Sequence, residues 1–161
     1  MIRRSGLLCA VVALGVAGFA SAAAGTAMSA KGPNPCTLLK PKEISTALGQ
    51  TAAKGKKGLN TPITKTCIFE VSAGNGQPEG EVVAIVQTTG AKIAYDALAK
   101  LPGNEKVAGL GKAYYIPRTG TVNNLVGPVL LGVQSVFIST EGHSDRKAET
   151  IALTKIAKKR V

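Results

Sequence analysis

The chain has 161 residues, of which 45% are hydrophobic and only 18% are charged, a balance that excludes intrinsic disorder and fibrous structure. Basic residues outnumber acidic ones by 20 to 9, and the formal charge is +11. This length suits one ordinary domain, and no apolar run after the first twenty-odd residues is long enough to span a bilayer.

The N-terminus has the organisation of a targeting segment. Residues 3–4 supply a basic start, residues 7–19 an apolar stretch, and residues 20–22 small side chains suited to cleavage. A helix over the apolar stretch would rise about 20 Å, well short of the roughly 30 Å hydrocarbon core. We therefore predict a signal peptide over residues 1–22, with cleavage sites up to Ala30 left open. The protein is expected to be exported, periplasmic or secreted, without a transmembrane anchor after cleavage.

Residues 23–33 are small or basic and predict a flexible lead-in to a single domain over residues 34–161. Apolar positions at helical spacing, with a proline at the start and a glycine at the end, predict a helix over residues 41–48. Residues 50–65 contain lysines and glycines without periodicity. They are predicted to form an exposed basic loop.

Alternating residues over 66–71 and a β-branched run over 82–87 predict two strands joined as a hairpin, with Cys67 on the core side. Thr88 or Thr89 can cap the helix that follows. That helix is predicted to end at Pro102-Gly103 and to bury Ile93, Ala94, Ala97, Leu98 and Leu101.

Residues 107–116 predict a loop and then a strand. Two apolar runs follow, over residues 125–131 and 134–140, and Gly132 is either a turn between two strands or a bulge in one. Ser144 can cap a last helix whose core face is predicted to comprise Ala148, Ile151, Ala152, Ile156 and Ala157. The order of elements predicts an α+β domain with a single antiparallel sheet of 4–5 strands and about three helices packed on it.

Cys36 and Cys67 are the two cysteines that follow the targeting segment. In an exported chain this pair predicts one disulfide. Closing a loop of about 30 residues should contribute on the order of 3.5 kcal/mol to stability. The spacing differs from the Cys-x-x-Cys of redox-active pairs, so a structural role is expected.

Several short motifs occur in order along the chain: Asn34-Pro35-Cys36-Thr37-Leu38-Leu39, Ala47-Leu48-Gly49, Thr66-Cys67-Ile68-Phe69, and the stretch 107–114. They resemble those of a family of small exported bacterial domains of unknown function, many of them actinobacterial lipoproteins. The resemblance extends to extracytoplasmic sensor domains of bacterial kinases with a PsbP-like fold, which implies a sheet covered by helices. This chain lacks the lipobox cysteine of many members. The resemblance implies no catalytic or binding residue.

Three short motifs contain residue types used in catalysis or phosphate binding. Gly109-x-Gly111 lacks the third glycine and the following helix of a dinucleotide site, so a tight turn is expected. The neighbours His143-Ser144-Asp145 cannot form a catalytic triad and are interpreted as a turn and helix cap. Glu79 and Glu81 would lie on one face of a solvated strand edge. We predict no catalytic residue, no metal site and no cofactor.

The basic surplus is the strongest functional signal, although a merely solvated basic face stays open as an explanation. Loss of Arg3 and Arg4 with the targeting segment would lower the formal charge only from +11 to +9. The densest clusters, predicted as candidate anion-binding residues, are Lys54, Lys56 and Lys57, and Lys155, Lys158, Lys159 and Arg160. Export and the scarcity of aromatic residues argue against nucleic acid.

Lipid head groups and acidic polymers are the anions of the cell envelope. The sequence therefore favours a non-enzymatic binding or sensor-like module whose partner is an anionic envelope component, a small ligand or an exported protein. A small envelope-directed hydrolase using His143, and an inhibitor of another exported protein, are the alternatives.

Overall fold

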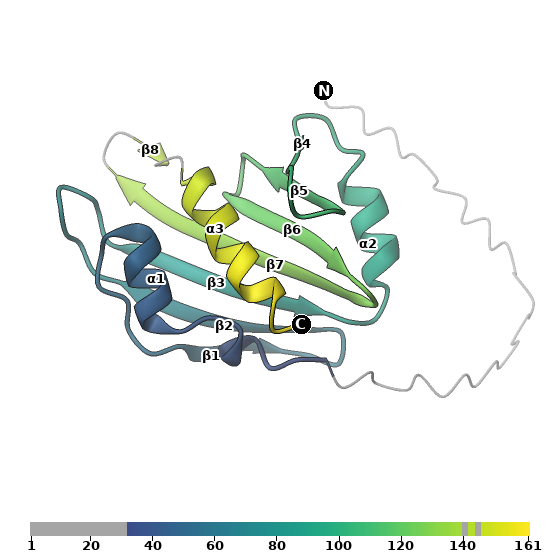
Figure 1. Ribbon diagram of the computed structural model, residues 1–161, viewed down its shortest axis with the longest axis horizontal. Coiled ribbons are helices and arrows are strands. Elements are labelled where there is room, and N and C mark those ends of the chain that lie inside the picture. Colours follow the sequence, from purple (N-terminus) through teal and green to yellow (C-terminus); the bar gives the residue numbers. More distant parts are fainter. Residues whose placement is uncertain (1–31, 140–141, 144–145) are drawn as a thin grey trace, which may run out of the picture.

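A computed structural model describes residues 32–139, 142–143 and 146–161 (Figure 1). The helical elements are the short 3-10 helix η1 (Pro35–Thr37), α1 (Pro41–Leu48), α2 (Ala91–Leu98) and α3 (Lys147–Lys158). The strands are β1 (Lys56–Asn60), β2 (Thr64–Val71), β3 (Gly80–Gln87), β4 (Glu105–Lys106), β5 (Ala113–Ile116), β6 (Thr121–Val126), β7 (Val129–Ser139) and β8 (Gly142–His143). None of the helices in these ranges is long and apolar enough to cross a membrane.

The strands form one antiparallel sheet in the order β1-β2-β3-β7-β6-β5-β4, and β8 pairs with the end of β7. The predicted hairpin is confirmed, because β2 and β3 pair along their whole length, from Thr64 opposite Gln87 to Val71 opposite Gly80. The long strand β7 joins this hairpin to β6. The α+β class, the single antiparallel sheet and the three helices are thus as predicted, but the sheet is wider than the 4–5 strands expected.

The first source of this error is the segment predicted as a loop over residues 50–65. It contains β1, whose residues are mostly exposed and therefore show no apolar alternation. Its two glycines bring the backbone close to β2: a Cβ at Gly55 would lie 2.6 Å from the sulfur of Cys67, and one at Gly58 would lie 2.5 Å from the hydroxyl of Thr66. Pairing with a neighbour, rather than any pattern of its own, makes this segment a strand.

The second source of error is the assignment of the last strands. The turn between β6 and β7 lies at Gly127-Pro128, inside the first predicted apolar run, and Gly127 has a φ of +54°. Gly132 is neither a turn nor a bulge, because it pairs in regular register with Ile85 on β3 and Asn123 on β6. A Cβ there would lie only 3.2 Å from the Cβ of Ile85, so the close approach of neighbouring side chains favours glycine.

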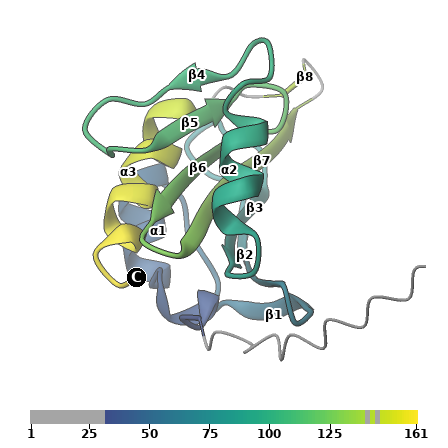
Figure 2. The ribbon, with the colours of Figure 1, turned by 90° about the vertical axis from the view of Figure 1, so that its right-hand side faces the viewer.

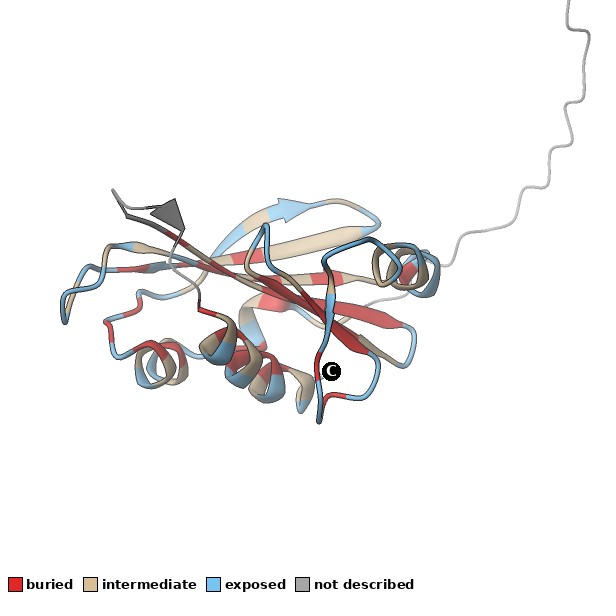
Figure 3. Cartoon of the chain, turned by 90° about the horizontal axis from the view of Figure 1, so that it is seen from above, coloured by how far each residue is buried: buried red, intermediate tan, exposed pale blue. Residues whose placement is uncertain are grey.

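The helices lie on opposite sides of the sheet. Figure 3 shows α1 and α3 together on one side, with α2 on the other. α3 contacts β6, β7 and α1, whereas α2 packs mainly on β6 and β7. The main core lies between the sheet and the α1–α3 layer, and its largest fully buried side chains include Phe69, Phe137, Leu38, Leu39 and Ile44. A smaller cluster at the other edge comprises Val107, Leu110, Ala113, Tyr115 and Val122.

The helix over residues 41–48 has the predicted bounds, with Gly49 at its end in the left-handed region at a φ of +68°. The predicted face of α2 is wrong in part. Ala94 and Leu98 are half-buried, but Ile93, Ala97 and Leu101 are exposed, and the buried residue is Ala91. The helix ends at Leu98, before Pro102. No side chain caps it, and its N-cap residue is Gly90 rather than a threonine.

The predicted face of α3 is also wrong in part. Ala148 and Ala152 are exposed, and the N-cap residue is Arg146 rather than Ser144. The helix buries Leu153 and Ala157 together with two threonines, Thr150 and Thr154. Each threonine hydroxyl donates to the carbonyl oxygen four residues earlier at 2.7 Å, so these polar groups can be buried without an unmet hydrogen bond.

Candidate anion-binding pocket

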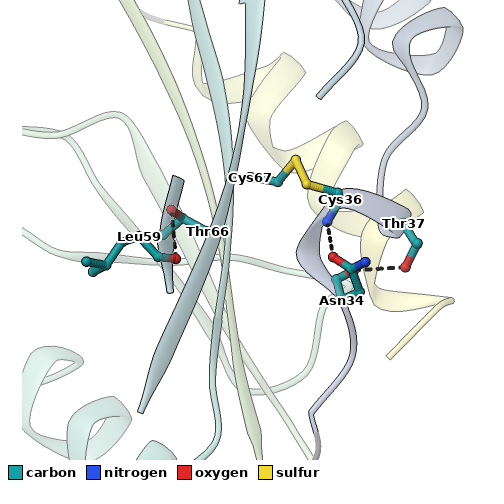
Figure 4. Close-up of a disulfide and its surroundings, with 6 residues drawn as sticks. All are labelled: Asn34, Cys36, Thr37, Leu59, Thr66 and Cys67. Carbon is teal, nitrogen blue, oxygen red and sulfur yellow. Dashed lines mark hydrogen bonds between the residues drawn. A yellow bond between two sulfur atoms is a disulfide. The ribbon is translucent and has the colours of Figure 1, made fainter. Parts of the chain in front are cut away.

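The predicted disulfide between Cys36 and Cys67 is present, with the two Cα atoms 5.0 Å apart (Figure 4). It joins η1 to the middle of β2. The Asn34 side-chain oxygen accepts a hydrogen bond from the backbone N–H of Cys36 at 3.0 Å, and the Thr37 hydroxyl donates to the Asn34 carbonyl at 2.8 Å. The chain ahead of α1 is therefore held against the β1–β2 hairpin.

A pocket of about 290 Å³ opens beside this junction. We call it the basic pocket, because it is lined by two lysines and no carboxylate. Its lining residues are Gly32, Asn34, Pro35, Lys57, Leu59, Asn60, Lys65 and Thr66. The N-terminal segment forms one wall and the β1–β2 hairpin forms the other.

The hairpin register explains why both lysines reach this side of the sheet. Lys57 on β1 pairs with Cys67, and Lys65 lies two residues before Cys67 on β2. Side chains two residues apart in a strand share a face, so both lysines lie on the side that carries the disulfide. Neither has an ion-pair partner in the described ranges. Asn60, which also lines the pocket, lies opposite Lys65 in the ladder.

Three of the seven predicted anion-binding residues have partners within the protein. Lys56 forms an ion pair with Glu70 at 2.6 Å, and the Lys158 ammonium donates to the Leu110 carbonyl at 3.0 Å. The Arg160 guanidinium binds the carboxylate of Glu43, with one contact at 2.5 Å. Hydrogen bonding by Arg160 is the main cause that lowers the pKa of Glu43.

Only Lys57 of the predicted residues lines the basic pocket. Lys54, Lys155 and Lys159 are exposed. Lys65 was missed, because the segment that contains it was predicted to be a loop. The signal that could have found it is the pair of lysines eight residues apart around Asn60-Thr61-Pro62, a sequence suited to a hairpin turn.

The other candidate motifs have different outcomes. Gly109 and Gly111 both have left-handed backbones, at φ of +78° and +76°, and the strand β5 follows them, as the tight-turn interpretation expects. His143 lies on β8, but Ser144 and Asp145 are outside the described residues, and so are the side-chain contacts of His143.

Glu79 and Glu81 line, together with Glu70, a shallow hollow of about 360 Å³. Glu70 and Glu81 are direct partners across β2 and β3. This hollow lies at the opposite end of β2 from Lys65. Within the described ranges, no group of three or more His, Cys, Asp or Glu side chains is arranged to hold a metal ion.

Comparison with known proteins adds no relative: no protein-family model, no curated protein and no solved structure matches the chain.

Proposed function

We propose that the chain is an exported, non-enzymatic binding module of the bacterial cell envelope that holds an anionic group, a phosphate or a carboxylate, in the basic pocket. The observation that carries this proposal is the presence of Lys57 and Lys65 in one hollow without a lining carboxylate. Two ammonium groups supply charge-assisted hydrogen bonds, which are about twice as strong as neutral ones.

The remaining lining residues narrow the chemistry of the ligand. Asn34 and Asn60 offer amide groups that can bind hydroxyls, and Pro35 and Leu59 offer apolar surface. A ligand in which an anionic group is joined to a polyol would meet the ammonium groups with its charge, the amides with its hydroxyls and the apolar surface with its carbon chain. Glycerol phosphate units, common to envelope lipids and polymers, have this chemistry.

The disulfide supports both the proposed export of the protein and the rigidity of the basic pocket. Disulfides persist in oxidising compartments outside the cytoplasm, which agrees with the predicted export. By holding Cys36 to β2, the bond keeps the two walls of the basic pocket together before a ligand arrives. Because a preformed pocket loses less conformational entropy when the ligand binds, more of the interaction energy contributes to affinity.

The test is a titration of the isotope-labelled protein with glycerol 1-phosphate, followed by two-dimensional NMR at physiological salt. The amides of the pocket residues are expected to shift, and a Lys57→Gln/Lys65→Gln double variant should bind at least tenfold more weakly, given about 1 kcal/mol or more for each charged contact. Uncharged glycerol should cause no comparable shift.

A matched control separates the pocket from the general positive charge. The Lys155→Gln/Lys159→Gln variant loses the same charge at two exposed positions of the α3 end. It should keep the affinity of the unchanged protein. An equal loss in both double variants, or shifts spread over the whole basic surface, would mean that glycerol 1-phosphate is held by general electrostatics and that the pocket proposal is wrong.

A further inference from the structure

Three large apolar side chains of the β1–β2 hairpin and α2 are exposed to solvent. Leu59 is 59% exposed, Ile63 is 50% exposed and Ile93 is 77% exposed. We call these three residues the apolar end. Single exposed apolar residues are common on proteins, so their position relative to one another and to charge is what matters.

The three residues of the apolar end lie on two segments that meet at one end of the sheet. Leu59 and Ile63 belong to the β1–β2 hairpin, and Ile93 belongs to the first turn of α2. The backbone N–H of Thr88, three residues before α2, donates to the carbonyl of Ile63 at 3.3 Å, which joins the hairpin turn to the start of the helix. Figure 2 views the molecule from this end, with α2 and the β1–β2 hairpin toward the reader.

Lysines surround the apolar end. Lys57 and Lys65 flank it on the hairpin and Lys92 on α2. The acidic residue of α2, Asp96, is neutralised by an ion pair with Lys92 at 2.5 Å. This end therefore combines exposed aliphatic side chains with an excess of positive charge.

The opposite end of β2 is acidic. Glu70, Glu79 and Glu81 gather where β2 ends and β3 begins. Glu70 is paired with Lys56, whereas Glu79 and Glu81 have no ion pair in the described ranges. Positive and negative side chains thus lie at opposite ends of β2, and an anionic surface would attract the lysine-bearing end and repel the glutamate-bearing end. Such a surface would therefore orient the molecule as well as attract it.

We propose that the apolar end rests on an anionic lipid membrane, with Leu59, Ile63 and Ile93 among the head groups and the basic pocket facing a lipid phosphate. This inference rests on the proposed function, because it names the source of the anionic group. Leu59 belongs to both features: it lines the basic pocket and is part of the apolar end. Exposed aliphatic side chains flanked by lysines are the combination that interfacial binding requires.

The chain contains no tryptophan, so one introduced indole reports on insertion without background. Protein carrying Ile63→Trp, purified from the exported fraction of cells that express the full chain, is mixed with vesicles of equal parts phosphatidylglycerol and phosphatidylcholine. Its emission is expected to shift to shorter wavelength and to be quenched by brominated acyl chains. Protein carrying Val161→Trp, at an exposed apolar position of the C-terminus, should show neither change.

Affinity for the same vesicles is measured by co-sedimentation. A Leu59→Ser/Ile63→Ser/Ile93→Ser variant is expected to bind at least tenfold more weakly. An Ile63→Ser/Ile93→Ser variant, which keeps every residue that lines the basic pocket, should also bind the vesicles more weakly, while its glycerol 1-phosphate affinity changes little. Each lysine replaced at this end should weaken binding about fivefold at physiological salt. Phosphatidylcholine vesicles alone should bind poorly.

The outcomes separate the two proposals. Binding of glycerol 1-phosphate without any vesicle binding or emission shift would overturn the membrane proposal alone. Vesicle binding that the triple serine variant loses, without any binding of glycerol 1-phosphate, would support the membrane surface and overturn the pocket. Vesicle binding that is equally strong in the triple serine variant would overturn the role of the apolar end.

Discussion

Arg160, two residues beyond the end of α3, donates to the carboxylate of Glu43 in the first turn of α1 through both terminal guanidinium nitrogens, Nη1 and Nη2, at 2.8 and 2.5 Å. The same guanidinium donates to the Leu38 carbonyl at 2.7 Å. Glu43 in turn accepts the backbone N–H of Lys40 at 2.8 Å. A residue predicted to bind external anions thus joins the chain end to the start of the first helix.

Replacing Glu43 by Gln is expected to cost about 0.5–1 kcal/mol at pH 7, the range of a partly exposed ion pair with good geometry. The pKa of Glu43 is lowered below its ordinary value of 4.5, chiefly by the hydrogen bond from Arg160. Its contribution is therefore present above about pH 4.5 and is lost as the pH falls through the lowered pKa.

Urea unfolding of Glu43→Gln and the unchanged protein at pH 7 and at pH 3 measures this difference. The stability gap should be largest at pH 7 and should shrink at pH 3. A gap that is as large at pH 3 would show that the substitution acts through packing instead of through charge.

Removing the disulfide by Cys36→Ser/Cys67→Ser should lower stability by about 3.5 kcal/mol, because the cross-link closes a span of 31 residues in the unfolded chain. Cys67 is fully buried, so the serine hydroxyl adds a desolvation cost. Cys36→Ala/Cys67→Ala isolates the loss of the cross-link. Denaturant midpoints that match the unchanged, oxidised protein would contradict the prediction.

Gly55→Ala is expected to destabilise the fold by about 1–3 kcal/mol, the usual cost of overpacking. The added methyl group would lie 2.6 Å from both the Cys67 sulfur and the Phe69 ring, and both side chains are fully buried. Gly74→Ala is the matched control, because no heavy atom lies within 4 Å of its added methyl group. Thermal unfolding of both variants measures the difference, and equal midpoints would count against the close approach of the β1 segment to β2.

Tyr114 should ionise at an unusually alkaline pH for a tyrosine. Burial raises its pKa to about 12, and its hydroxyl has no hydrogen-bond partner among the described residues. Because the folded-state pKa is raised above the ordinary value of 10.0, stability should fall as the pH rises from about 10 to 12. The absorbance of ionised tyrosine is followed as the pH is raised, for the unchanged protein and for Tyr114→Phe. The ionisation step that the variant lacks belongs to Tyr114.

Tyr114→Phe should leave stability at pH 7 unchanged or slightly higher, since it removes a buried hydroxyl that makes no hydrogen bond. The packing of this ring against Tyr95, with centroids 5.3 Å apart, does not need the hydroxyl. A marked loss of stability would show that the hydroxyl has a stabilising contact.

The sequence by itself determined the elements whose signals are local. Pro41 and Gly49 bound α1, and the alternation around Cys67 and Phe69 marks β2 and its buried face. The cysteine count was enough to predict the disulfide. For α1 and β2 the residues that carry the signal also form the element, so neighbouring positions were sufficient.

The tertiary structure decided what depends on distant partners. β1 exists because β2 pairs with it, and α2 turns Ile93 outward because it packs on β6 and β7 through Ala91 and its neighbours. The tertiary structure also decided which charged residues come together. Arg160, from a basic cluster in the sequence, pairs with Glu43, and Lys57 lies beside the same pocket as Lys65 of the neighbouring strand. Charges interact according to their distance in space, which the order of residues along the chain does not give.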